Sequence, residues 1–130
     1  RSCKSILYPS LQEGFGMVSY EAMANGCLTF ANAHPVMLSA CPIGPVYIDA
    51  YPEQTKMNWL RYHMNTSSEV HEQDMELAAE LWEDEIRDVL NDPTRIDQHQ
   101  SEGLEAIGAF NKHIDFCYES FYDFILANYK

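Results

Sequence analysis

Two glutamates and two glycines are grouped where a strand is expected to give way to a helix. Glu13, Gly14 and Gly16 lie in a short loop, and Glu21 follows in the next helix-forming segment. Glycines let a backbone approach a ligand closely, and the first N–H groups of a helix favour an anion such as phosphate. Carboxylates beside such an anion suggest ligand hydroxyls that donate to them, as in a sugar nucleotide. Alternatively, Glu13 and Glu21 only complement the positive end of the helix.

The elements that must position these residues follow from apolar runs and from helix or strand breakers. Runs at 5–8, 27–31 and 45–49, bounded by Pro, Gly or Asn, predict buried strands. Residues 17–25 are rich in helix formers and end before Gly26, which suits a helix C-terminus. Strand, loop, helix and strand in this order make a βαβ unit with parallel strands and a right-handed crossover. Ligands bind beyond the carboxyl ends of such strands, where the glycine-rich loop is expected to lie.

The rest of the chain is predicted to be helical. A helix is expected over about 53–64, and the longest periodic pattern covers 68–91, which carries nine acidic residues against Arg87. A solvated face is the simpler interpretation of these acids, and a basic partner is the alternative. The sequence therefore predicts an α/β chain, with a partial Rossmann-like parallel sheet of about three strands in residues 1–66 and helices in residues 67–130.

Two apolar stripes accompany these helices. The stripe of 68–91 consists of Leu77, Leu81, Ile86 and Leu90, widened by Ala78, Trp82 and Val89. Residues 94–111 are moderately helical and are interrupted by Gly103 and Gly108. A last helix over 113–129 has a second stripe, more typical of a core than of a ligand site, formed by Ile114, Cys117, Tyr118, Phe121, Phe124, Ile125 and Asn128. Its aromatic surface exceeds what one face can bury, so Phe116 and Tyr122 are expected to point away from the core and to make the isolated chain self-associate or adhere.

Length, charge and cysteine usage exclude several classes of protein. With 130 residues the chain suffices for one ordinary domain, and its net charge of −12 opposes generic nucleic-acid binding or docking on an anionic membrane. No apolar run approaches the roughly 18 residues that span a bilayer, so a soluble protein is predicted. The four cysteines lack C-x-x-C spacing, which favours a reduced cytoplasmic compartment. The histidines show no metal-ligand spacing, and the start at Arg1 suggests a fragment.

A family resemblance adds to these patterns over residues 5 to about 64. The segment EGFGMVSYE (13–21) resembles the E-x7-E motif of retaining, nucleotide-sugar-dependent glycosyltransferases built from two Rossmann-like domains, the GT-B type. EAMANGCLTFAN (21–32) is similar to the continuation of that motif, and PVYIDAYPEQ (45–54) to a later strand and turn. The sequence departs from the family at Leu28, where proline is frequent, and at His34-Pro35, where a glycine-rich stretch with a glutamate is usual.

The resemblance implies a role for each matching residue. Glu13 matches the glutamate that approaches the hydroxyls of the transferred sugar at the reaction centre, and Glu21 matches the one that accepts hydrogen bonds from the ribose diol. The loop that lines the sugar and the diphosphate, and the helical turn whose N–H groups face the distal phosphate, correspond to Gly14, Phe15, Gly16, Met17 and Val18.

The resemblance also implies what surrounds this site. Residues 1–130 would be the C-terminal, donor-binding portion of the enzyme, inactive without an N-terminal domain that holds an unknown acceptor. The donor is a nucleoside diphosphate sugar, and neither a metal nor another cofactor is expected. The last helix would pack on the N-terminal domain and mask its aromatic stripe there. A non-catalytic acidic interaction module on the same fold and a sugar-nucleotide epimerase remain alternatives. His34 is either a ligand of the phosphate or sugar or an incidental loop residue.

Overall fold

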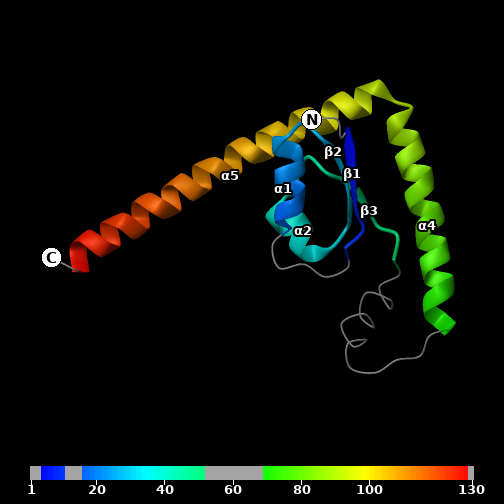
Figure 1. The fold of residues 1–130 in the computed structure, drawn as a ribbon, viewed down its shortest axis with the longest axis horizontal. Coiled ribbons are helices and arrows are strands. Elements are labelled where there is room, and N and C mark those ends of the chain that lie inside the picture. The colour runs from blue at the N-terminus through cyan, green and yellow to red at the C-terminus, as the bar shows by residue number, and fades with distance from the viewer. Residues whose placement is uncertain (1–3, 11–15, 52–68, 129–130) are drawn as a thin grey trace.

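Three parallel strands form the centre of the chain in the computed structural model, which describes residues 4–10, 16–51 and 69–128 (Figure 1). The sheet has the order β1-β2-β3, with strands β1 (Ser5–Tyr8), β2 (Leu28–Asn32) and β3 (Val46–Ile48). Both neighbouring pairs are parallel. Helix α1 (Met17–Ala24) connects β1 to β2, which confirms the predicted βαβ unit. The predicted fold class, a small parallel sheet followed by a helical C-terminal half, is also confirmed.

A second, shorter connection crosses from β2 to β3. Helix α2 (Pro35–Ala40) begins directly after His34, which was expected to lie in a loop. His34 precedes it with an extended backbone, and its Nδ1 accepts a hydrogen bond of 3.2 Å from the Val36 N–H. Pro35 stands at the first helical position, where its missing N–H leaves no intrahelical bond unmade. The loop expectation is wrong because a capping residue followed by proline is itself a signal for the start of a helix.

Two long helices make up the second half, α4 (Glu69–Leu90) and α5 (Pro93–Asn128). As predicted, the first ends before Pro93, where Asp92 accepts a hydrogen bond of 2.9 Å from the Thr94 N–H and so starts the next helix. The two separate helices expected over 94–111 and 113–129 are wrong, because α5 is continuous. The helix predicted over about 53–64 lies outside the described residues.

Gly103 does not interrupt α5. Its lack of a side chain instead allows α5 to pack closely against α1 and the turn before β3. A Cβ there would lie 3.1 Å from the Met23 Sδ of α1, and a Cβ on Gly44 would lie 2.8 Å from the Gly103 Cα. The backbone of α5 therefore approaches the turn before β3 more closely than a larger residue would allow. Gly108 is exposed, and a Cβ on this residue would meet nothing within 4 Å. It lowers the helix propensity of α5 without interrupting the helix.

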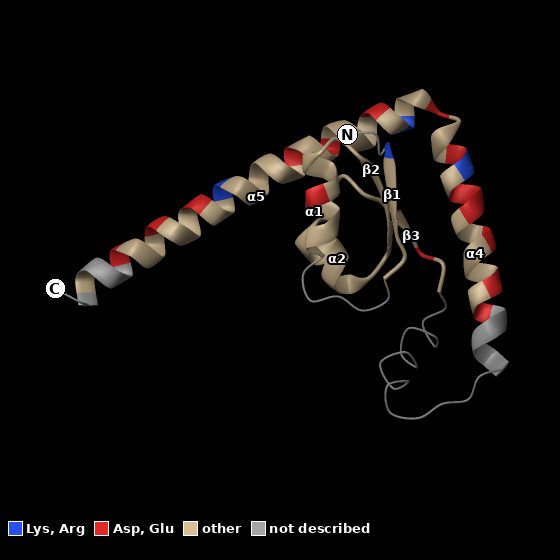
Figure 2. Cartoon of the chain, in the orientation of Figure 1, with Lys and Arg blue, Asp and Glu red and all other residues tan. Residues whose placement is uncertain are grey.

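One hydrophobic core lies between the sheet and α4. It contains Leu28, Phe30, Val46, Ile48, Ala50, Tyr51, Ala78, Trp82 and Val89, with Ile86 and Ile96 packed against it. Leu77, Leu81 and Leu90 are exposed, although the sequence placed them on the same apolar stripe. The helix turns the Ala78–Trp82–Val89 side toward the sheet, and its acidic residues line much of the remaining surface (Figure 2).

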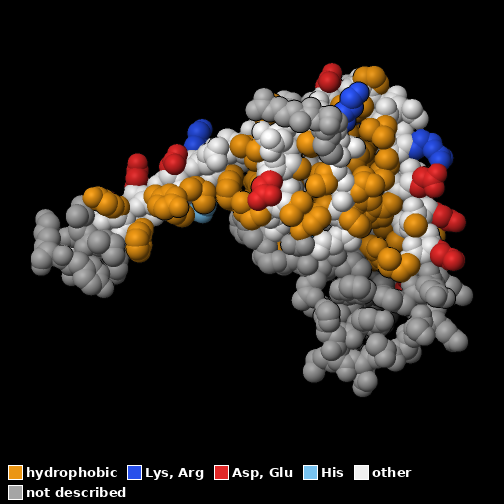
Figure 3. Space-filling view, viewed as in Figure 1, with side chains coloured by type: hydrophobic (Ala, Val, Ile, Leu, Met, Phe, Trp, Pro, Cys, Tyr) orange, Lys and Arg blue, Asp and Glu red, His pale blue; other side chains and the backbone are white. Residues whose placement is uncertain are grey.

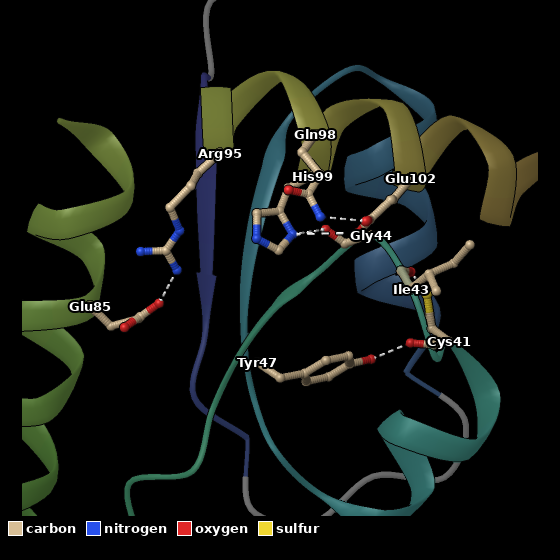
Figure 4. Close-up of polar contacts among 9 residues, drawn as sticks. All are labelled: Cys41, Ile43, Gly44, Tyr47, Glu85, Arg95, Gln98, His99 and Glu102. Carbon is tan, nitrogen blue, oxygen red and sulfur yellow. Dashed lines mark hydrogen bonds and ion pairs between the residues drawn. The ribbon is translucent and has the colours of Figure 1, made fainter. Parts of the chain in front are cut away.

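A second core lies on the other side, between α1, the end of α2 and α5. Tyr20, Met23, Cys41 and Ala106 are buried there, and the rings of Tyr20 and Phe110 lie 4.5 Å apart between centroids. The first turns of α5 also cross the amino ends of the strands. Figure 4 shows His99, whose Nδ1 lies 3.2 Å from the Gly44 carbonyl oxygen just before β3. The carboxyl ends of the strands therefore face away from α5.

The far half of α5 extends beyond the rest of the molecule (Figure 1). Every side chain from residue 115 to residue 123 is exposed, including Tyr118 at 71% and Phe121 at 63%. The expectation that this stripe belongs to a core is wrong for these residues, because no other described element reaches them. The predicted exposure of Phe116 and Tyr122 is confirmed, at 65% each. None of the described helices is both long and apolar enough to cross a membrane.

Candidate functional site

The best-defined part of the predicted site is the start of α1. Gly16 precedes the helix in the left-handed region, with φ 77° and ψ 33°, and is buried. A Cβ on this residue would lie 2.0 Å from the Met37 Sδ of α2, so both the backbone conformation and the packing require glycine. Among the described residues, no side chain caps the helix, and its first turn contains no acidic residue. No described side chain therefore occupies the first N–H groups of α1.

The predicted donor-binding residues of α1 share one exposed face. Met17 and Val18 are 42% and 38% exposed, and Glu21, three and four residues later, is exposed as well. Residues three or four apart lie on the same side of a helix, so the Glu21 carboxylate stands about one turn from the helix start. The other face of α1 is buried in the fold. Glu13, Gly14 and Phe15 lie outside the described residues.

Asn32 is a polar residue at the carboxyl ends of the strands, and it was not predicted as a site residue. It ends β2 and is 2% exposed, and its Nδ2 donates a hydrogen bond of 3.3 Å to the Ser10 carbonyl oxygen, just after β1. Its Oδ1 is buried without a hydrogen-bond partner in the part of the chain that the structure describes. A polar residue at the carboxyl end of a fully buried strand is the signal that could have identified it. Asn32 thus connects the end of β2 to the residues that follow β1.

His34 has a structural role as the residue that caps α2. Because its Nδ1 accepts the Val36 N–H, the neutral ring must carry its proton on Nε2. The ring is half-buried and caps α2, which favours the interpretation of His34 as a residue without a direct ligand role. Among the residues that the structure describes, no three His, Cys, Asp or Glu side chains are grouped so that they could hold a metal ion.

Two tyrosines hold α2 in place behind the site. The Tyr20 hydroxyl donates to the Ala40 carbonyl, and the Tyr47 hydroxyl donates to the Cys41 carbonyl (Figure 4). Burial, reinforced by the neighbouring Cys41, raises the pKa of Tyr20 to about 12, and burial also raises the pKa of Tyr47. The pKa of Cys41 is raised by burial too, so its thiol stays protonated at neutral pH. These groups are structural and fix Met37, which in turn contacts the Gly16 position.

Comparisons with known proteins add no assignment to this geometry. No family model matches the chain, and neither a curated protein nor a solved structure matches it.

Proposed function

We propose that this chain is the donor-binding portion of a retaining, nucleotide-sugar-dependent glycosyltransferase. The observation that carries the proposal is the placement of Glu21 on the exposed face of α1, one turn after a buried, left-handed Gly16. That arrangement offers the N–H groups at the start of α1 to a phosphate and a carboxylate to hydroxyls about one turn away. A nucleoside diphosphate sugar carries both kinds of group.

The reaction that we propose replaces one bond to the sugar with another. The bond between the anomeric carbon and the diphosphate oxygen breaks, and a bond to the acceptor oxygen forms on the same face of the sugar. The acceptor hydroxyl gives up its proton to the departing nucleoside diphosphate. The N–H groups at the start of α1, from Met17 and Val18, would stabilise the charge that develops on that diphosphate. Glu13 would orient the sugar hydroxyls, and Glu21 would hold the ribose diol.

The proposal includes parts that lie outside this sequence. A second, N-terminal domain would hold the acceptor, so the 130 residues by themselves would bind the donor without transferring sugar. Neither a metal nor a further cofactor is part of the proposal, and a cytoplasmic location is proposed because of the cysteine pattern.

The test is donor binding by the complete protein and by its Glu21→Gln variant. Calorimetry with nucleoside diphosphates of the common bases and with their glucose conjugates would first identify the base. We expect the variant to bind the preferred donor about 1.5–3 kcal/mol more weakly, which is the typical value of a charge-assisted hydrogen bond. Glu80→Gln, which neutralises an exposed carboxylate on α4, serves as the matched control and should bind like the wild type.

A donor with a 2′,3′-dideoxyribose separates a direct contact from an indirect effect. It should bind the wild type and Glu21→Gln equally, because the hydroxyls that Glu21 would hold are absent. Unchanged affinity of the variant for the intact donor would refute the assignment of Glu21. Failure of every nucleotide to bind would favour a non-catalytic interaction module, and turnover of the sugar nucleotide to its epimer without an acceptor would favour an epimerase.

A further inference from the structure

A regular apolar seam runs along α5 from the packed part of the molecule into the projecting part. Its residues alternate at spacings of four and three: Gly103, Ile107, Phe110, Ile114, Cys117 and Phe121. This is the heptad spacing that lets two helices pack side by side with knobs in holes. The seam differs from a general aromatic excess, because Phe116 and Tyr122 do not belong to it. A seam of this kind calls for a second helix along its whole length.

The chain itself covers only the first half of the seam. Gly103 lies against Met23 of α1, and Ile107 and Phe110 pack on the core between α1 and α5. Ile114 is half-buried, and Cys117 and Phe121 are exposed. Residues 115–123 are all exposed and extend over about 14 Å at 1.5 Å per residue, with no described segment of this chain on their seam. Figure 3 shows the hydrophobic side chains that gather along this projecting part.

We infer that the projecting half of α5 pairs with the same segment of a second copy of this chain, in antiparallel orientation. In a parallel pair, the packed parts of the two copies, each formed by the sheet with α1, α2 and α4, would collide. The reason is that α1 already occupies the seam around Gly103 and Phe110. An antiparallel pair centred on residue 119 avoids this collision, because the packed part of each copy then lies beyond the C-terminal end of the other copy's α5. This centre also places Cys117 of one copy opposite Phe121 of the other, two residues on either side of the symmetry axis.

The charges of the projecting half agree with a second copy as the occupant. Asp115, Glu119 and Asp123 recur every four residues and form one exposed row. The heptad spacing puts this row on the side of α5 away from the seam, so pairing brings no carboxylate against another. The seam itself carries no charge that a basic partner would need. Each copy nevertheless has a net charge of −12, so the two copies repel one another at long range.

The area of the contact predicts a weak dimer. Tyr118 flanks the seam and Phe121 lies in it, and both are about two thirds exposed. Together with Ile114 and Cys117 from each copy, they would bury at most about 900 Å² in total. That lies below the usual range for stable interfaces, so we expect a Kd in the micromolar range. Added salt should strengthen the pairing, because it screens the repulsion between the copies and favours apolar contact.

Sedimentation velocity of the 130-residue chain at about 1–300 μM tests the inference with a matched pair of variants. Phe121 in the seam and Phe116 outside it are 63% and 65% exposed, so Phe121→Asp and Phe116→Asp remove equal apolar surface at different positions. We expect a concentration-dependent dimer for the wild type, at least tenfold weaker pairing for Phe121→Asp and a change of less than twofold for Phe116→Asp. Circular dichroism would confirm that both variants keep their helices.

The orientation is tested with a double variant. When Cys117→Lys is combined with Phe121→Asp, an antiparallel pair brings the introduced lysine of one copy to the introduced aspartate of the other, whereas a parallel pair stacks like charges. We expect the double variant to pair at least threefold more tightly than Phe121→Asp alone. A wild type that stays monomeric to 300 μM, larger aggregates, equal effects of the two single variants, weaker pairing in high salt or no rescue by the double variant would each overturn the inference.

Discussion

Replacing Gly16 by alanine tests whether the start of α1 is held as tightly as the geometry indicates. Gly16 has φ 77°, a conformation that costs a residue with a Cβ about 1–2 kcal/mol. The new methyl group would also lie 2.0 Å from the Met37 Sδ, and Met37 is only 1% exposed. Overpacking of a buried site costs roughly 1–3 kcal/mol more. We therefore expect Gly16→Ala to lower the free energy of unfolding by about 2–5 kcal/mol.

Gly26→Ala provides the matched control because it isolates the backbone term. Gly26 has φ 74°, nearly the same as Gly16, but a Cβ on Gly26 would meet nothing within 4 Å. Only the conformational cost of about 1–2 kcal/mol is expected there. Urea unfolding followed by circular dichroism would measure both variants, with the slope checked to stay constant.

A double-mutant cycle with Met37→Ala separates strain from overlap. Shortening Met37 removes the atoms that the new methyl group would strike, so Gly16→Ala should cost less in that background, by roughly 1–3 kcal/mol. If Gly16→Ala costs no more than Gly26→Ala, or if the two changes at Gly16 and Met37 are additive, the argument from close packing is refuted.

Three further predictions concern packing, pH and catalysis. Gly103→Ala should stabilise the chain less than Gly108→Ala in urea unfolding, because both gain roughly 1 kcal/mol of helix propensity but only the methyl group at residue 103 would press on Met23, at 3.1 Å. Burial raises the pKa of Tyr20 from 10.0 to about 12, so the folded chain keeps this proton at a pH where the unfolded chain has lost it. The free energy of unfolding should therefore fall between about pH 10 and 12, and it should fall less in the Tyr20→Phe variant. In the complete protein, Glu13→Ala should lower kcat strongly and leave nucleoside diphosphate affinity almost unchanged by calorimetry, whereas equal losses would make Glu13 structural.

The sheet and the start of the site could be predicted because local signals fix them. Short apolar runs between breakers located the three strands to within a residue or two, and the glycines before residue 17 marked the start of α1. Asn32 was missed because its importance comes from the parallel pairing, which brings the end of β2 beside Ser10 after β1. The place of Asn32 at the end of a buried strand is a local signal, but it does not identify Ser10 as the partner.

The helical half was predicted less well because its outcome depends on tertiary packing. Gly103 weakens a helix on propensity alone, yet in the fold it allows α5 to lie against Met23 and Gly44. Likewise, Leu81 and Trp82 both fit a helical stripe, and only the position of α4 over the sheet decides that Trp82 is buried and Leu81 exposed. A periodic pattern identifies the helix, while the neighbouring element selects which side it covers.

The two proposals concern opposite ends of the molecule and are tested on different proteins: donor binding on the complete protein, and pairing on the 130-residue chain, in which no N-terminal domain covers α5. The proposed donor site lies where the strands end, at the start of α1, whereas α5 contacts the turns before β2 and β3, through Gln100 to the Gly26 carbonyl and His99 to the Gly44 carbonyl. The proposed pairing segment begins beyond Phe110, past these contacts. Glu21→Gln should therefore leave the dimer unchanged, and Phe121→Asp should leave nucleotide binding unchanged. Coupling between the two would require a path through α1, where Tyr20 and Met23 contact α5 on the side of the helix opposite to Glu21.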